Sequence, residues 1–197
     1  KPLELVEAVL NRTRVAREAI ACLVVGLGPG SYTGIRSAIA LAQGWQLARP
    51  VRLVGVSTAD CLAAQAHVQQ WFGRVQVLID AQRNEFYVAV YQIDAAGWKT
   101  VEPLRLAAMK DVCARAPEKP ELSGAGPNTS PDSEPGARIL IGPEVDRWFA
   151  DARVLFPDAG VLGQLAWGRT DFVSGEKLEP IYLRATAFVK APPPRIL

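Results

Sequence analysis

The chain has 197 residues and an almost balanced charge, with 22 lysines and arginines against 20 aspartates and glutamates. This balance argues against a polybasic nucleic-acid-binding protein, because such proteins neutralise many phosphates at once. Hydrophobic residues make up 49% of the chain. That composition is typical of a folded protein with one domain or two small lobes.

The cysteines and the histidine limit the chemistry that the chain can perform. Three well-separated cysteines with no Cys-x-x-Cys pair indicate reduced thiols and a cytoplasmic protein. His67 is the single histidine, which excludes a metal site with two or three histidine ligands. No apolar run approaches the roughly 20 residues of a membrane span. We therefore expect neither a metal nor a cofactor.

Helices and short apolar strands alternate at the start of the chain. Ser31 and Ser57 stand where two of these helices begin, as N-cap residues do. The alternation predicts a parallel sheet with helices on it. The predicted elements are a helix over 2–13, a strand over 21–25, a helix over 33–48, a strand over 52–56 and a helix that follows Ser57.

After Trp71 the pattern changes to consecutive strands, which predicts an antiparallel meander. A stretch rich in proline and glycine at 116–137 is interpreted as a surface loop. We therefore predict a first lobe over 1–72, a second lobe over 73–184 and a tail over 185–197. The predicted elements of the second lobe are strands at 75–80, 86–91, 100–104, 138–141 and 153–156 and helices at 106–115, 143–150 and 158–173.

A glycine-rich loop joins the first strand to the second helix and is the first candidate site. Glycines allow a tight turn, and the free N–H groups of a helix N-terminus can bind an anion such as phosphate. No Gly-Lys-Ser/Thr follows, so this is not a Walker A loop. On spacing alone, a tight turn with close packing of the helix and no ligand is the favoured explanation of the glycines. The candidate phosphate contacts are Gly28, Gly30, Ser31, Thr33 and Gly34.

Two other segments carry candidate function. The helix over 33–48 is rich in glycine, alanine and serine on more than one face, which favours either a partner helix or close internal packing. The segment over 80–85 places two carboxylates and an arginine at a predicted hairpin. This segment is either a functional site or a charged turn with a local ion pair. No base or nucleophile stands beside it in the sequence.

Four blocks of the sequence resemble the bacterial TsaB family, also called YeaZ. They keep the family's order and approximate spacing, and they cover most of the chain outside 116–137. The blocks are Gly28-Pro29-Gly30-Ser31-Tyr32-Thr33-Gly34-Ile35-Arg36 with Ala42-Gln43-Gly44, then Val54-Gly55-Val56-Ser57-Thr58, then Asp80-Ala81-Gln82-Arg83-Asn84-Glu85-Phe86-Tyr87, and finally Pro180-Ile181-Tyr182-Leu183-Arg184.

The resemblance implies a two-lobed α/β fold of the actin-like class, the sugar-kinase and Hsc70 superfamily. It also implies a non-catalytic scaffold that pairs with and activates TsaD, which transfers a threonylcarbamoyl group to N6 of adenosine 37 in tRNA. The ATPase TsaE would join that complex, tRNA would be reached indirectly, and the chain alone would form a homodimer. The expected interface residues lie on the helices at 2–13 and 33–48 and are Leu3, Val6, Arg36, Ala40 and Gln43.

The resemblance assigns no role to five other motif residues, Asp80, Arg83, Glu85, Tyr182 and Arg184. Family members open with a strand and hairpin that are not found here, so we expect a first lobe that is incomplete at its N-terminus. The alternatives are a nucleotide-binding actin-like enzyme and a glycoprotease-like hydrolase. The catalytic paralogue builds its metal site from paired histidines, and one histidine favours the non-catalytic subunit.

Overall fold

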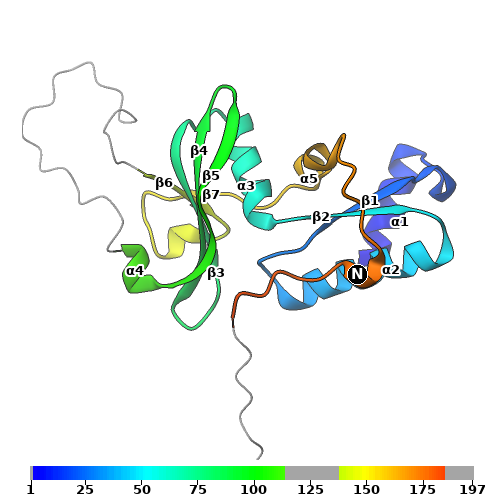
Figure 1. Ribbon diagram of the computed structural model, residues 1–197, viewed down its shortest axis with the longest axis horizontal. Coiled ribbons are helices and arrows are strands. Elements are labelled where there is room, and N and C mark those ends of the chain that lie inside the picture. Colours follow the sequence, from blue (N-terminus) through cyan, green and yellow to red (C-terminus); the bar gives the residue numbers. More distant parts are fainter. Residues whose placement is uncertain (1, 114–137, 185–197) are drawn as a thin grey trace, which may run out of the picture.

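The computed structural model describes residues 2–113 and 138–184. The chain forms two α/β lobes that lie side by side, each with its own sheet (Figure 1). The loop predicted at 116–137 and the tail predicted at 185–197 lie outside the described residues. None of the helices in the described parts of the chain is long and apolar enough to cross a bilayer.

The first lobe contains the parallel strands β1 (Cys22–Gly26) and β2 (Arg52–Val56). Helix α2 (Tyr32–Ala48) connects them and contacts α1 (Pro2–Thr13). The predicted parallel pair and both helices are confirmed. The core of this lobe is apolar and contains Val25, Ile39, Ala42, Val51, Leu53 and Leu178.

The second lobe is built on a five-stranded sheet in the order β5-β4-β3-β6-β7. Strands β3 to β5 form the predicted antiparallel meander, and β6 and β7 add to it in parallel. Gly142 ends β6 where a Cβ would lie 1.9 Å from the Leu78 carbonyl oxygen, so only glycine fits there. The strands are β3 (Gly73–Asp80), β4 (Glu85–Asp94), β5 (Gly97–Ala108), β6 (Arg138–Gly142) and β7 (Arg153–Val154).

Helix α3 (Thr58–Val68) follows β2 directly and packs against the sheet of the second lobe. Ser57 caps its N-terminus, as predicted, by accepting a hydrogen bond from the Ala59 N–H. The buried residues of α3 surround the whole helix, and four of them are alanines, which let the sheet and a second helix approach closely. They are Ala59, Cys61, Leu62, Ala63, Ala64, Gln65 and Ala66.

The chain returns to the first lobe after β7. Helix α5 (Ala159–Ala166) contacts α3, β1 and β2, and Val173 forms a bridge with Leu53 of β2. Short 3₁₀ turns at Val145–Arg147 and Gly175–Lys177 complete the described elements after β6. These contacts join α5 and the chain after it to the first lobe. We therefore propose that residues 159–183 belong to the first lobe, although the sequence analysis placed them in a second lobe over 73–184.

Three predicted helices differ from the structure. The helix predicted at 106–115 begins only at Met109, as α4 (Met109–Cys113), because β5 continues along β4 as far as Ala108; residues 114–115 lie outside the described part of the chain. The helix predicted at 143–150 is only the 3₁₀ turn after Glu144, whose left-handed backbone (φ 54°) interrupts helical geometry. The helix predicted at 158–173 ends at Ala166, because Gly168 also has a positive φ of 77°.

Gln65 connects α3 to the chain between β7 and α5 and provides the first testable prediction. Its amide donates to the Phe156 carbonyl at 3.0 Å and accepts from the Asp158 N–H at 3.2 Å. Gln65→Leu leaves both backbone groups without that partner, so we expect it to lower the free energy of unfolding by about 1–3 kcal/mol. Urea unfolding measures this, with the exposed Gln69→Leu as control. Equal effects of both substitutions would contradict the role of Gln65.

Candidate functional site

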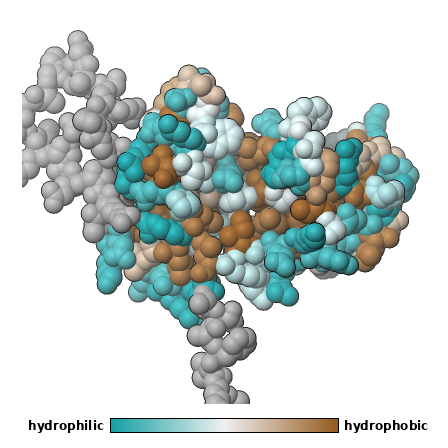
Figure 2. Space-filling view, viewed as in Figure 1, coloured by the Kyte–Doolittle hydropathy of each residue, from teal (hydrophilic) through white to brown (hydrophobic). Residues whose placement is uncertain are grey.

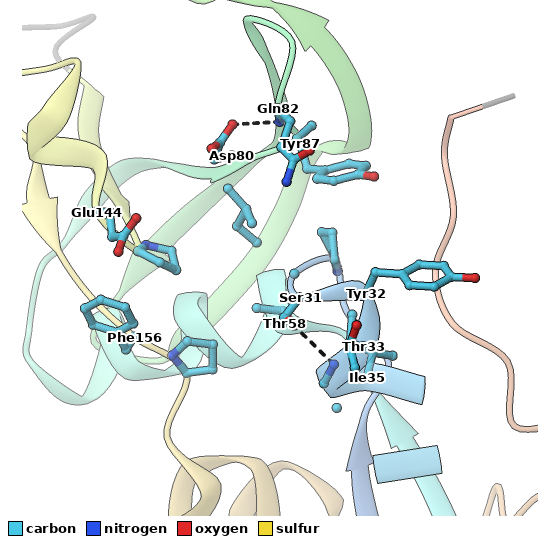
Figure 3. Close-up of a pocket in the computed structure, with 18 of the residues that line it drawn as sticks. Ser31, Tyr32, Thr33, Ile35, Thr58, Asp80, Gln82, Tyr87, Glu144 and Phe156 are labelled. Atoms are coloured by element: carbon cyan, nitrogen blue, oxygen red, sulfur yellow. Dashed lines mark hydrogen bonds between the residues drawn. The ribbon is translucent and has the colours of Figure 1, made fainter. Parts of the chain in front are cut away.

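An open cleft of about 980 Å³ lies between the two lobes. One wall is the glycine-rich loop with the start of α2, and the facing wall is the end of β3 with the turn that follows it (Figure 3). Glu144 and Phe156 close a third side. The cleft therefore brings together two segments that the sequence offered as separate candidates, the loop over 28–34 and the segment over 80–85.

The glycine-rich loop is fixed by backbone hydrogen bonds to the first lobe. The Leu27 N–H donates to the Val56 carbonyl at 2.9 Å, and the Thr58 N–H donates to the Gly28 carbonyl at 2.8 Å. Gly28 has φ 91°, and a Cβ there would lie 2.6 Å from Cδ1 of Ile35. Glycine is favoured here by the backbone angle, and a Cβ would also force the end of the Ile35 side chain to move.

The residues predicted to contact phosphate lie on this wall, with Gly30, Ser31, Thr33 and Gly34 lining the cleft and Gly28 buried beside them. Ser31 is the N-cap of α2, as predicted, because its Oγ accepts from the Gly34 N–H at 3.3 Å. This bond uses one of the N–H groups that an anion would need. Phosphate binding at the loop stays a prediction.

The facing wall contains a strained turn. Gln82, Arg83 and Asn84 are three consecutive residues with left-handed backbone angles, at φ 62°, 56° and 59°. Each such residue costs about 1 kcal/mol or more when it is not glycine, so the turn needs support from its surroundings. Part of that support is Asp80, whose carboxylate accepts from the Gln82 N–H at 2.7 Å (Figure 3).

The 180–184 segment supplies the rest of the support. Arg184 donates to the Ala81 carbonyl at 2.8 Å and forms an ion pair with Glu85 at 2.5 Å. At its other end, the Ile181 N–H donates to the Leu27 carbonyl at 2.9 Å. The segment thus spans the two walls of the cleft and holds the strained turn from outside. Asp80, Glu85 and Arg184 therefore share a structural role in supporting this turn, which the sequence did not reveal.

Tyr182 extends this contact to helix α2. Its ring stacks on Tyr32 with 5.8 Å between centroids, and the Arg36 guanidinium lies 5.2 Å above the Tyr32 ring. Arg36 also donates to the Tyr32 hydroxyl at 3.0 Å. Its hydrogen bond to Tyr182 is the main cause that raises the pKa of Arg36. The three side chains therefore form one group at the first turn of α2.

The other predicted interface residues lie on α1 and α2. Leu3 is 52% exposed and Val6 is half-buried, while Ala40 is exposed. Gln43 is partly buried, and its amide donates to the Gly175 carbonyl at 2.8 Å, so this group already has a partner inside the chain. Arg36, Ala40 and Gln43 line a second, shallower hollow of about 520 Å³. Arg83 lies apart from them at the tip of the strained turn.

The cleft contains few groups suited to catalysis. The described residues include no cluster of three His, Cys, Asp or Glu side chains that could bind a metal. Burial raises the pKa of the Cys61 thiol, which makes it a poor nucleophile because the thiolate is the reactive form. Cys61 is also not among the residues that line the cleft. Burial, followed by the nearby Asp60 carboxylate, raises the pKa of Tyr91, which donates to Asp60 at 2.7 Å.

Sequence reasoning missed several residues that line the cleft, among them Tyr87, Glu144 and Phe156. Tyr87 lies on β4, Glu144 follows β6 and Phe156 follows β7. The alternation of β4 placed Tyr87 on one face of the sheet, which was a usable signal. Glu144 and Phe156 gave no signal, because only the order of strands in the sheet brings them to the cleft.

Comparisons with known proteins give a consistent assignment. The family model described as "TsaD: tRNA N6-adenosine threonylcarbamoyltransferase" matches residues 2–129. The TsaB protein of Escherichia coli K12, a tRNA threonylcarbamoyladenosine biosynthesis protein, is 31% identical over 92% of this chain and 78% of its own length. The Bacillus subtilis TsaB protein is 35% identical over 44% of this chain and 37% of its own length.

Solved structures agree with these relatives. A Pseudomonas aeruginosa structure described as similar to the peptidase YeaZ superposes with a TM-score of 0.68 and 26% identity, over 92% of this chain and 82% of its own. The chain belongs to the TsaD-type family that the model describes and, within it, to the TsaB (YeaZ) proteins. The expected two-lobed, actin-like α/β fold is confirmed.

The ion pair between Arg184 and Glu85 gives the second testable prediction. Arg184→Ala removes this pair and the hydrogen bond to the Ala81 carbonyl, so it should lower the free energy of unfolding by about 1–2 kcal/mol. Glu85→Gln should cost less, and a double-mutant cycle should give a coupling of about 0.5–1 kcal/mol for these half-exposed groups. Hydrogen exchange should also speed up at 81–85. Unchanged exchange there would show that the segment does not hold the turn.

Proposed function

We propose that this protein is a non-catalytic subunit in threonylcarbamoyladenosine modification of tRNA, acting as a scaffold that binds and activates TsaD. The family assignment supports the pathway. The observation that carries the scaffold role is an exposed face of small and apolar side chains on α1 and α2. A scaffold requires such a surface, because its activity is binding to another protein.

The exposed face of α2 is a continuous stripe. Positions 36, 40, 44 and 47 recur at helical spacing and are all exposed, with Leu47 at 91%. On α1, which contacts α2, Leu3, Leu5 and Val9 are also each at least half exposed. Large exposed apolar side chains gathered on two adjacent helices favour a protein–protein contact.

Gly44 is the most informative residue of this stripe. A Cβ added there would meet nothing within 4 Å, so packing inside the chain does not require glycine. Glycine within a helix costs about 1 kcal/mol relative to alanine. A partner helix that approaches closely at this point explains why a destabilising residue stands there.

The absence of catalysis by this chain alone is part of the proposal. The full sequence has one histidine, so it cannot supply the paired histidines of the catalytic paralogue. His67 lies on α3 beside Phe72 and Trp98, with centroids at 6.5 Å and 5.8 Å, and does not line the cleft. In this proposal TsaD supplies the catalytic centre, TsaE joins the complex, and the same helical face forms a homodimer when TsaD is absent.

One observation favours a second candidate function, nucleotide binding in the cleft. The N-terminus of α2 faces the cleft, and a helix N-terminus favours the negative charge of a phosphate. Calorimetry with ATP and Mg²⁺ separates this candidate from the scaffold role. Turnover of ATP by the chain alone would overturn the non-catalytic proposal, whereas binding without turnover would be compatible with it.

Ala40→Glu tests the helical face. The substitution places a charge in the middle of the exposed stripe, which we expect to weaken association with TsaD at least tenfold, or about 1.4 kcal/mol. The monomer should keep its stability, because position 40 is exposed. Analytical ultracentrifugation with TsaD measures the effect, and Thr170→Glu, an exposed position outside the stripe, is the control. Undiminished association of Ala40→Glu would exclude this face.

Gly44→Ala tests whether glycine stands there for a partner. We expect the isolated chain to become more stable by about 0.5–1 kcal/mol, because alanine lowers the entropy lost on helix formation. Association with TsaD should weaken at the same time. Urea unfolding and ultracentrifugation measure the two effects. Higher stability with unchanged association would show that no partner approaches Gly44.

A further inference from the structure

The segment over 180–184, which we call the strap, contacts both lobes. In the first lobe, the Ile181 N–H donates to the Leu27 carbonyl at 2.9 Å, and the Tyr182 ring stacks on Tyr32. Figure 1 shows the strap in orange-red, running from beside α2 to the junction of the lobes. Figure 2 shows hydrophobic residues gathered in the middle of the view, at that junction, with hydrophilic residues around them. The strap thus adds hydrogen bonds across a junction where apolar residues concentrate.

The other end of the strap supports a turn that stores strain. The three consecutive left-handed residues of the turn over 82–84 keep this geometry only while the surrounding contacts outweigh its cost. Arg184 supplies two of these contacts, at 2.8 Å to the Ala81 carbonyl and 2.5 Å to the Glu85 carboxylate. The turn is therefore an element with two states, held while Arg184 is in place and free to relax when Arg184 leaves.

The first-lobe end of the strap is part of the surface of α2. The hollow of about 520 Å³ that Arg36 and Ala40 line is also lined by Pro180, at the start of the strap. Tyr32 lines both this hollow and the cleft. Its stacking partner Tyr182 is 49% exposed, and Tyr32 itself is 60% exposed. A protein that fills the hollow therefore contacts α2 and the strap together.

This arrangement links the outer surface of α2 to the wall of the cleft. A protein that contacts the strap only while the strap is in place binds that state more tightly and shifts the population toward it. Such coupling is reciprocal, so a change that loosens the strap must weaken the same protein's binding. Strap and turn share Arg184, so the turn over 82–84 is stabilised together with the strap.

We propose that the strap couples the partner face of α2 to the strained turn of the cleft, so that a protein bound over Tyr182 holds the turn in place. The proposal rests on the proposed function, which supplies TsaD as the protein. Arg184 is a positioning residue in this proposal. It contributes to the affinity for TsaD from the end of the strap that contacts the second lobe.

The first test uses the isolated full-length chain and hydrogen exchange at 81–85. Tyr182→Ala removes the stack on Tyr32 and touches no residue of the turn, yet it should speed up exchange there about two- to fivefold, the range expected for contacts between half-exposed groups. Tyr182→Phe keeps a ring to stack and should restore the wild-type rate. Phe172→Ala is the matched control, since it removes a half-exposed ring that lies 4.9 Å from the Arg52 guanidinium in the first lobe.

The second test uses TsaD from the same organism. TsaD should slow exchange at 81–85 in the wild-type chain, and Arg184→Ala should weaken TsaD binding about two- to fivefold in ultracentrifugation. Arg147→Ala is the control, because it breaks an exposed ion pair with Glu144 that stays within the second lobe. We expect it to leave the affinity for TsaD unchanged. Circular dichroism checks that each variant folds, and the Tyr182 variants decide the matter if Arg184→Ala does not.

The strap and the scaffold function can fail separately. If TsaD binds but neither slows exchange at 81–85 nor loses affinity with Arg184→Ala, the scaffold function stands and the coupling is overturned. If TsaD does not bind the wild-type chain, the scaffold function fails, and the link between the α2 surface and the turn is decided by the Tyr182 variants. Equal exchange at 81–85 in Tyr182→Ala and Phe172→Ala would overturn that link.

Discussion

The burial of helix α3 is the constraint on which the rest of the structure depends. The helix begins directly after β2 of the first lobe, yet its alanines pack against the sheet of the second lobe. A helix buried on every side fixes both of its neighbours, because any rotation of one lobe would open a gap at the helix. Gln65 adds a specific polar contact to this packing, since its amide hydrogen-bonds the backbone that leads from β7 into α5.

Fixing the lobes places two distant segments face to face across the cleft. The glycine-rich loop is held by backbone bonds within its own lobe, whereas the turn over 82–84 is strained and depends on other segments. The segment over 180–184 connects the two, with Ile181 bonded to the loop side and Arg184 to the turn. A chain that stores strain in one wall of its cleft needs such a connection to keep the wall in place.

The outer surface of the first lobe suits a protein contact. Large apolar side chains are exposed on α1 and α2, and Gly44 lies on the exposed side of α2, where a Cβ would meet nothing inside the chain. A residue that weakens the helix without helping its packing is explained by a contact outside the chain.

The sequence by itself determined the local elements and the family. Apolar periodicity gave α1, α2 and the strands, and Ser31 and Ser57 gave the helix starts, because capping is a local interaction. It misjudged the helices after 105, where pairing with β4 and left-handed residues such as Glu144 override helical patterns. Only the tertiary structure decided the cleft and the place of Arg184, because these depend on strand order and on long-range contacts, which join residues that lie far apart in the chain.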